Sequence, residues 1–143
     1  MPVRTATARW EGPLQGGKGA MRLGTGAFDG AYSFSTRFEE EPGTNPEELI
    51  GAAHAGCFSM QVGAVLERRG NPAESIETEA RVHLRRDDTG NRIARIDLIT
   101  RGRVPGIDEA TFKEVAQEAK EGCIVTRALG GVEEMTLEAT LER

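Results

Sequence analysis

The sequence predicts an α+β fold, in which helices lie on antiparallel sheet. Three features support this class: short segments separated by glycines before residue 31, one long apolar helix pattern that begins at Pro46, and alternating apolar and polar residues after position 75. In order they give three strands, a helix, two strands, two helices and a final strand, which is typical of α+β proteins. The chain has 143 residues and no internal repeat or low-complexity linker, so we expect a single domain over residues 1–143.

The composition restricts the classes of function. Hydrophobic residues make up 38% of the chain and charged residues 29%, which suits a globular protein with a core. A formal net charge of −5 argues against a nucleic-acid partner, because phosphate binding draws mostly on clustered Lys and Arg. No apolar run approaches the roughly 18–20 residues of a membrane span, and the start of the chain lacks the apolar segment of a secretory signal. We therefore expect a cytoplasmic protein without a membrane partner.

Glycines divide the first part of the chain into three expected strands, over residues 3–10, 19–26 and 31–38. In the third strand Tyr32, Phe34, Thr36 and Phe38 share one face, since side chains alternate along a strand. A meander with glycine turns fits this spacing.

A long helix is the clearest local prediction. Asn45 is a good N-cap, Pro46 suits the first helical position, and Glu47 and Glu48 suit the positive end of a helix. Gly70 favours a left-handed stop after residue 69. Between residues 49 and 66 the clearly polar side chains are those of His54, Ser59 and Gln61. We therefore expect the helix to be buried on all sides, with a second subunit covering what one small domain leaves open.

The rest of the chain predicts a sheet and two further helices. Alternation over residues 76–84 indicates a strand, residues 87–91 a turn, and residues 93–104 the returning strand. Asp108 caps a helix that runs to Lys120, with Gly122 as its stop. We expect a short third helix over residues 123–129 and a closing strand over residues 132–141.

Two cysteines are the main candidates for reactive residues. Cys57 lies in the middle of the long helix and Cys123 at the start of the short one, 66 positions later, so any contact between them is tertiary. A lone cysteine is most often a small buried hydrophobic residue. A reactive thiolate at Cys57 needs a nearby cation, because burial raises the pKa of a thiol. The candidate cation is Arg37, oriented by a carboxylate at the helix start, either Glu47 or Glu48.

The histidines provide weaker alternatives. His54 is three residues before Cys57, and as a base it would make a Cys–His acyl-transfer site or thiol hydrolase. A helix histidine of this kind is more often a hydrogen-bonded core residue. His83 lies on an expected strand and faces solvent in our interpretation. The cysteines and histidines lack Cys-x2-Cys or His-x3-His spacing, so we expect no metal site.

One segment is specific enough to identify a family. Residues 43–60, GTNPEELIGAAHAGCFSM, resemble the core motif of the OsmC/Ohr family, the osmotically inducible and organic hydroperoxide resistance proteins. Shorter matches are ARWEG at 8–12 with GKG at 17–19, TRFE at 36–39, VPGID at 104–108 and AKEGC at 119–123. Together they extend over nearly the whole chain, and they are most similar to the OsmC branch.

The resemblance implies an OsmC-like intertwined homodimer, with antiparallel sheets around a long central helix that carries the reactive cysteine. It also implies a thiol-dependent peroxidase that reduces organic hydroperoxides and hydrogen peroxide. By their places in the motifs, Cys57 matches the peroxidatic cysteine and Cys123 the resolving cysteine. Glu47 matches the carboxylate that holds an arginine, here Arg37, over the thiolate. The implied reductant is a small dithiol or a dithiol-bearing protein, and no metal, flavin or haem is implied.

One position departs from the family pattern. The residue after the second cysteine is commonly proline, and here it is Ile124, which lessens the pre-organisation of the turn at Cys123. The apolar walls expected for an alkyl hydroperoxide are Phe34, Phe58, Met60 and Ile124. The competing hypothesis without catalysis is a stress-protective binding protein with an apolar cavity.

Overall fold

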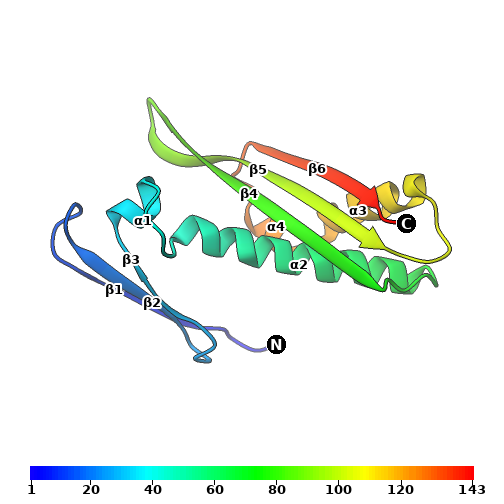
Figure 1. The fold of residues 1–143 in the computed structure, drawn as a ribbon, viewed down its shortest axis with the longest axis horizontal. Coiled ribbons are helices and arrows are strands. Elements are labelled where there is room, and N and C mark those ends of the chain that lie inside the picture. Colours follow the sequence, from blue (N-terminus) through cyan, green and yellow to red (C-terminus); the bar gives the residue numbers. More distant parts are fainter. The chain divides into compact units, whose positions relative to one another are not determined.

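The α+β class is confirmed by the structure, a computed structural model that describes all 143 residues. Six strands and four helices occur along the chain (Figure 1). They form two compact units, Met1–Leu49 and Ile50–Arg143. The single domain over residues 1–143 stays a prediction.

The first unit contains a small antiparallel sheet of β1 (Ala6–Glu11), β2 (Lys18–Leu23) and β3 (Asp29–Tyr32), in that order. In the pairing register Gly19 stands between Trp10 and Tyr32. A Cβ atom at Gly19 would lie 2.6 Å from each of these rings. Glycine is therefore required there for the two rings to pack, with centroids 5.5 Å apart.

Residues 34–38 form a helix, so the strand expected over 31–38 is wrong beyond Tyr32. Helix α1 (Phe34–Phe38) begins after Ser33, whose hydroxyl accepts a hydrogen bond from the Thr36 amide at 3.2 Å. In return the Thr36 hydroxyl accepts one from the Ser33 amide at 2.8 Å. This reciprocal capping box outweighs the alternation of aromatic and polar residues. Arg37 therefore lies on a helical turn and not on a strand.

The long helix α2 (Pro46–Arg68) agrees with the expected helix to within one residue. The Asn45 side chain accepts a hydrogen bond from the Glu48 amide at 2.7 Å, as an N-cap does. Beyond the helix Gly70 has φ +84°, the left-handed conformation that ends a helix.

Helix α2 is long and apolar enough, by length and composition, to cross a membrane, so the expectation that no segment reaches this limit is wrong. An 18-residue window of the helix has a mean hydropathy of 1.5. His54, Ser59 and Gln61 interrupt the apolar run, but the mean hydropathy of the window stays high enough for a membrane-spanning helix. The core helix of a water-soluble protein meets the same criteria, and 33% of this window is buried.

Within the single chain one face of α2 is buried; burial on all sides, with a second subunit covering the remainder, stays a prediction. His54, Phe58 and Val62 have no exposed surface. The opposite face is exposed within the single chain, and it consists of small or apolar residues: Ala52, Ala53, Gly56 and Met60.

The second unit has a three-stranded sheet of β4 (Ser75–Asp87), β5 (Gly90–Arg103) and β6 (Glu134–Leu141). Strands β4 and β5 form an antiparallel hairpin, but β6 pairs with β5 in parallel, so the expectation of wholly antiparallel sheet is wrong. A parallel neighbour needs a crossover connection. Helices α3 (Glu109–Gly122) and α4 (Ile124–Ala128) provide it.

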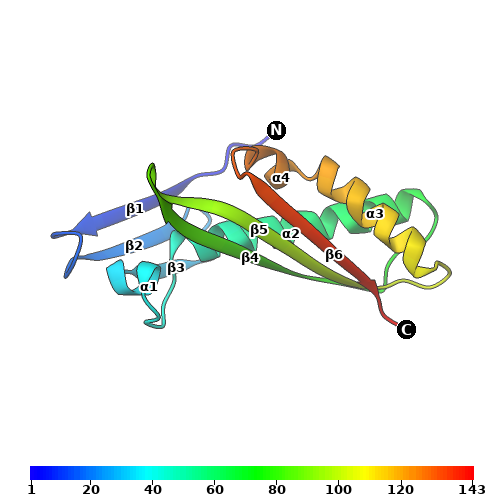
Figure 2. The ribbon, with the colours of Figure 1, turned by 90° about the horizontal axis from the view of Figure 1, so that it is seen from above.

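The core of the second unit lies between its helices and one face of this sheet. Figure 2 shows α2 and α3 on the same side of β4, β5 and β6. The core contains Phe58 and Leu66 from α2, Phe112 from α3 and Leu98 from β5, all without exposed surface. Cys123 belongs to the same cluster. Asp108 caps α3 as expected, by accepting a hydrogen bond from the Thr111 amide at 2.8 Å.

Candidate active site

The two cysteines lie side by side in the second unit. Their sulfur atoms are 3.3 Å apart and share an S–H···S hydrogen bond, and both thiols are free. A disulfide has an S–S length of about 2.05 Å, so oxidation requires an approach of roughly one ångström. Cys57 is partly exposed, whereas Cys123 has no exposed surface. A molecule that arrives from solvent therefore reaches the Cys57 sulfur first.

Two helix boundaries place Cys123 against the middle of α2. Cys123 ends α3 and caps α4, with φ −68° and ψ 124°. This single extended residue turns the chain between the two helices. The expectation that Cys123 opens the short helix is therefore confirmed.

The two thiols have opposite pKa shifts. Burial raises the pKa of Cys57, although hydrogen bonds from the backbone amides of Val125 and Ile124 act against it. Burial also acts to raise the pKa of Cys123, but hydrogen bonds from the Thr126 hydroxyl and amide, and from Cys57, outweigh it and lower the pKa. Because the thiols share a hydrogen bond, the first ionisation belongs to the pair. Within the second unit, the negative charge is favoured on Cys123.

The candidate arginine and its carboxylate form a pair in the first unit. Arg37 Nε lies 2.9 Å from Glu47 Oε1, and Arg37 Nη2 lies 2.8 Å from the same oxygen. The Glu47 side chain is 8% exposed and that of Arg37 is 40% exposed. The structure therefore selects Glu47, and not the exposed Glu48, as the partner of Arg37. A guanidinium has five N–H donors, so Arg37 retains donors for a second anion.

The four candidate residues thus form two pairs. Arg37 and Glu47 belong to the first unit, and Cys57 and Cys123 to the second. The placement of the guanidinium over the thiolate stays a prediction.

His54 is a hydrogen-bonded core residue, as the more common interpretation of a helix histidine predicts. It has no exposed surface, and its Nε2 lies 2.8 Å from Thr126 Oγ1. Its Nδ1 has no hydrogen-bond partner. Burial lowers the pKa of His54, so the imidazole is neutral at pH 7. No hydrogen bond joins His54 to Cys57, which the Cys–His alternative requires.

Thr126 is a residue of this site that the sequence analysis missed. Its hydroxyl lies 2.8 Å from His54 Nε2, and Thr126 also acts to lower the pKa of the Cys123 thiol. The available signal was a hydroxyl residue three positions after Cys123, in the first turn of the expected short helix.

An aromatic cavity of about 210 Å³ lies in the first unit beside Arg37. It is lined by Trp10, Leu14, Tyr32, Ser33, Phe34, Arg37 and Phe38. Of the expected apolar walls, Phe34 lines this cavity. Phe58 does not line a cavity open to a ligand, because it lies fully buried in the core. Met60 and Ile124 are 79% and 76% exposed.

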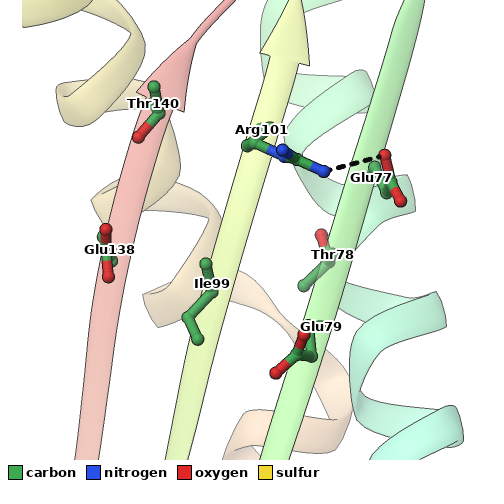
Figure 3. Close-up of a pocket in the computed structure, with 7 residues that line it drawn as sticks. All are labelled: Glu77, Thr78, Glu79, Ile99, Arg101, Glu138 and Thr140. Atoms are coloured by element: carbon green, nitrogen blue, oxygen red, sulfur yellow. Dashed lines mark hydrogen bonds and ion pairs between the residues drawn. The ribbon is translucent and has the colours of Figure 1, made fainter.

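A second depression, of about 390 Å³, contains no thiol. Most of its side chains project from the sheet face opposite the helices, and Arg101 lies 3.5 Å from Glu77 (Figure 3), whereas the Thr78 hydroxyl accepts a hydrogen bond from Ser59 of α2 at 2.7 Å. The depression is lined by Glu77, Thr78, Glu79, Ile99, Arg101, Glu138 and Thr140. No group of three or more His, Cys, Asp or Glu side chains in the chain is arranged to hold a metal ion.

Comparison with known proteins identifies the family. The family model described as "OsmC-like protein" matches residues 38–138. "Peroxiredoxin OsmC" of Escherichia coli (strain K12) is 46% identical over 136 residues, which cover 94% of each chain. The chain belongs to the OsmC-like family. The resemblance found in the sequence is therefore confirmed.

More distant members of the OsmC-like family agree. "Organic hydroperoxide resistance protein OhrB" of Bacillus subtilis (strain 168) is 27% identical over 115 residues, which cover 77% of this chain and 83% of that protein. The higher identity to OsmC agrees with the expected branch. The crystal structure of an OsmC-like protein from Mycoplasma pneumoniae superimposes with a TM-score of 0.76, 14% identity and 99% coverage of both chains. At that identity the superposition shows the shared fold.

Ile124, the departure from the family's common proline, changes the surroundings of Cys57. Ile124 is the first residue of α4, and its backbone N–H acts to lower the pKa of the Cys57 thiol. Proline has no N–H. This member of the OsmC-like family therefore has a donor at Cys57 that a proline would remove.

Proposed function

We propose that this protein is a thiol-dependent peroxidase, which reduces organic hydroperoxides and hydrogen peroxide through Cys57 and Cys123. The observation that carries the proposal is the 3.3 Å separation of two free thiols of unequal exposure. A peroxide meets the partly exposed Cys57 before the buried Cys123. The names of two relatives, a peroxiredoxin and an organic hydroperoxide resistance protein, support a peroxide-related role.

The reaction has two steps and a reduction. The Cys57 thiolate attacks the terminal peroxide oxygen; an S–O bond forms, the O–O bond breaks, and the leaving alkoxide takes a proton and departs as an alcohol. Cys57 is left as a sulfenic acid. The Cys123 sulfur then attacks the Cys57 sulfur; the S–S bond forms, the S–O bond breaks, and hydroxide leaves with a proton as water. A small dithiol or a dithiol-bearing protein restores both thiols by exchange.

The first step needs the negative charge on Cys57, whereas the hydrogen bonds of the thiol pair favour it on Cys123. A cation near Cys57 reverses this preference, because an opposite charge favours the ionised thiol. We assign this cation to Arg37, oriented by Glu47. The assignment is supported by the positions of both residues in the family motif and by their ion pair.

An organic substrate also needs apolar surface. The aromatic cavity beside Arg37 is a candidate for the alkyl or aryl group of the hydroperoxide, because four of its lining residues are Trp10, Tyr32, Phe34 and Phe38. Its volume of about 210 Å³ sets the scale of the group that it holds. The steps require no metal, flavin or haem. Free thiols suit the cytoplasm, where they stay reduced.

An intertwined homodimer is the assembly that fits the surfaces of the single chain. The buried apolar core contains no residue of the first unit, and all six residues of β1 are exposed. So small a unit without a core does not fold alone. A second copy covers the exposed apolar face of α2 and supplies the missing core. Analytical ultracentrifugation tests this assembly, and a monomer at micromolar concentration would contradict it.

The proposed function is tested with purified, reduced protein, cumene hydroperoxide and a dithiol. We expect continuous consumption of the hydroperoxide, none with Cys57→Ser, and one turnover followed by over-oxidation with Cys123→Ser. Ser59→Ala, two positions from Cys57 on the same helix, is the matched control and keeps full turnover. Mass spectrometry after one equivalent of hydroperoxide should show a loss of two hydrogens at one Cys57–Cys123 crosslink.

Two results would exclude the proposal. Full turnover by Cys57→Ser means that this thiol is not the nucleophile. A wild-type protein that binds cumene hydroperoxide and leaves it unchanged fits the non-catalytic binding hypothesis instead.

A further inference from the structure

One side chain of the first unit joins the helix that carries Arg37 to the helix that carries Glu47. Asn45 Oδ1 accepts a hydrogen bond from the Glu48 amide at 2.7 Å, which caps α2. Nδ2 of the same side chain donates to the Thr36 carbonyl at 3.1 Å. Asn45 is therefore both the cap of α2 and a bridge to α1, and both contacts lie within the first unit.

The two partners determine the orientation of the Asn45 side-chain amide. A backbone N–H donates and a carbonyl accepts, so the amide oxygen faces Glu48 and the amide nitrogen faces Thr36. Among the good N-cap residues, asparagine alone has separate donor and acceptor atoms, because ionised aspartate only accepts and serine and threonine have a single hydroxyl oxygen. The bridge thus requires asparagine, whereas the cap alone does not.

Helix α1 depends on contacts outside itself for its orientation. It has five residues and none of them is buried, and so short a helix is marginal by itself. The carbonyls at its C-terminal end have no helical partners. The Glu39 amide donates to the Ser35 carbonyl at 3.0 Å, and the next carbonyl, that of Thr36, accepts from Asn45.

The bridge lies next to the ion pair in both segments. Thr36 precedes Arg37, and Asn45 is two residues before Glu47, so the hydrogen bond and the ion pair join the same segments side by side. Both side chains of the ion pair are long, so the pair by itself leaves the α1 backbone free to shift. The bridge ends on that backbone. The Phe38 ring, whose centroid lies 5.0 Å from Arg37 Cζ, then packs against a guanidinium of fixed direction.

We infer that Asn45 is a positioning residue for the peroxidase reaction: it holds the Thr36 carbonyl and thereby fixes the backbone from which Arg37 extends to Glu47. The inference rests on the proposed function, in which the guanidinium favours the ionised form of Cys57. Asn45 acts only through Arg37 and transfers no proton. Its contribution is to reduce the conformations that the ion pair explores before the peroxide reacts.

Two substitutions separate the bridge from the cap. Asn45→Asp and Asn45→Ser keep an oxygen that caps α2, but neither has an amide N–H for the Thr36 carbonyl. The serine variant adds no charge, so it distinguishes the lost bridge from the new carboxylate of the aspartate variant. Asp108→Asn and Asp108→Ser are the matched controls, because the Asp108 side chain caps α3 through Thr111 without bridging to another helix.

The decisive measurement needs no peroxide. Arg37 Nε donates to Glu47 Oε1 at 2.9 Å, which slows the exchange of its hydrogen with water, and ¹H–¹⁵N spectra follow that exchange. The signal is assigned by its absence from Arg37→Lys. We expect about fivefold faster exchange in both Asn45 variants, the effect of one lost hydrogen bond, and no change in the Asp108 variants. An unchanged exchange rate in either Asn45 variant overturns the inference.

Peroxidase kinetics connect the bridge to the reaction. We expect cumene hydroperoxide to oxidise Cys57 about fivefold more slowly at pH 7 in both Asn45 variants, and at the wild-type rate at high pH, where Cys57 is ionised without the guanidinium. An equal loss at every pH would indicate general damage to the fold and would overturn the positioning role. Failure of the proposed function is recognised separately, as a wild type that does not consume hydroperoxide.

A measurement on the wild type covers the case in which the Asn45 variants do not fold. We expect the Nδ2 hydrogens of Asn45 to exchange with water more slowly than those of the exposed Asn91 in β5. Equal exchange of the two side-chain amides would mean that Asn45 does not hold the Thr36 carbonyl in solution, which overturns the inference.

Discussion

Replacement of Ile124 by proline tests the backbone amide that acts to lower the pKa of Cys57. The exchange removes one N–H from the sulfur and introduces the residue that family members commonly have at this position. The backbone accepts it, because Ile124 is the first residue of α4, where the N–H has no helical partner. The preceding Cys123 has φ −68° and ψ 124°, within the range that a following proline allows.

The expected effect is a slower first step at neutral pH. One hydrogen bond contributes a net stabilisation of about 1 kcal/mol, which corresponds to roughly a fivefold change in an equilibrium constant. Loss of the amide donor raises the pKa of Cys57, so less of the thiol is ionised at pH 7. We therefore expect Cys57 to be oxidised roughly fivefold more slowly. The Ile124 side chain is 76% exposed, so its loss costs little packing.

The assay is rapid-quench mass spectrometry of Cys57 oxidation by cumene hydroperoxide across a range of pH. Ile124→Ala is the control, because it shortens the side chain and keeps the amide. Oxidation of Cys57 should be slower in the proline variant than in the alanine variant at pH 7. The two rates should reach the same plateau at high pH, where Cys57 is ionised in both variants. Equal rates at every pH would refute the assignment of this amide as a donor to Cys57. A faster proline variant would show that pre-organisation of the turn outweighs the lost donor.

Three further changes test the Arg37–Glu47 pair, the core and the Asp97 carboxylate. Glu47→Ala removes the buried partner of Arg37, and we expect kcat/KM for cumene hydroperoxide to fall by roughly 100-fold. Glu48 is exposed, so Glu48→Ala should leave kcat/KM unchanged. Equal effects of the two substitutions would contradict the selection of Glu47 as the partner of Arg37. Phe58→Ala empties a fully buried site, and urea unfolding should show a loss of roughly 3–5 kcal/mol. Hydrogen bonds from Thr136, then Arg95 and His83, hold the pKa of Asp97 far below its usual value. Because the pKa of Asp97 is lower in the folded than in the unfolded protein, this stabilisation is present above about pH 4 and is lost as the pH falls below it. Asp97→Asn should therefore lower the urea midpoint more at pH 6 than at pH 3. A larger loss at pH 3 would contradict the expected direction of the pH dependence.

The sequence predicted those elements whose signals are local. Asn45, Pro46 and Gly70 set the ends of α2, and Asp108 sets the start of α3, because caps act within one turn of the chain. Helix α1 was missed because two local signals compete there. The capping box of Ser33 and Thr36 prevailed over the alternation that predicted a strand.

Features that depend on contacts between residues far apart in the sequence were harder to predict. The parallel pairing of β6 with β5 depends on a crossover through two helices, which strand patterns do not report. The Arg37–Glu47 pair was foreseen, because position along the chain left Glu47 and Glu48 open and the resemblance to the family motif selected Glu47. Thr126 was missed because its partner His54 is 72 positions away in the sequence and meets it only in the folded second unit.

The charge preference of the thiol pair explains why a second charged pair is needed for the proposed reaction. Within the second unit the negative charge is favoured on Cys123, which is buried and therefore protected from peroxide. The accessible Cys57 then keeps its proton and is a poor nucleophile. A guanidinium that moves the charge to Cys57 activates the pair without any change in the distance between the sulfurs. Once Cys57 is oxidised, the donors that hold Cys123 as a thiolate serve the second step. In the proposed reaction the same hydrogen bonds thus oppose the first step and favour the second, and we assign to the Arg37–Glu47 pair the role of offsetting that opposition at Cys57.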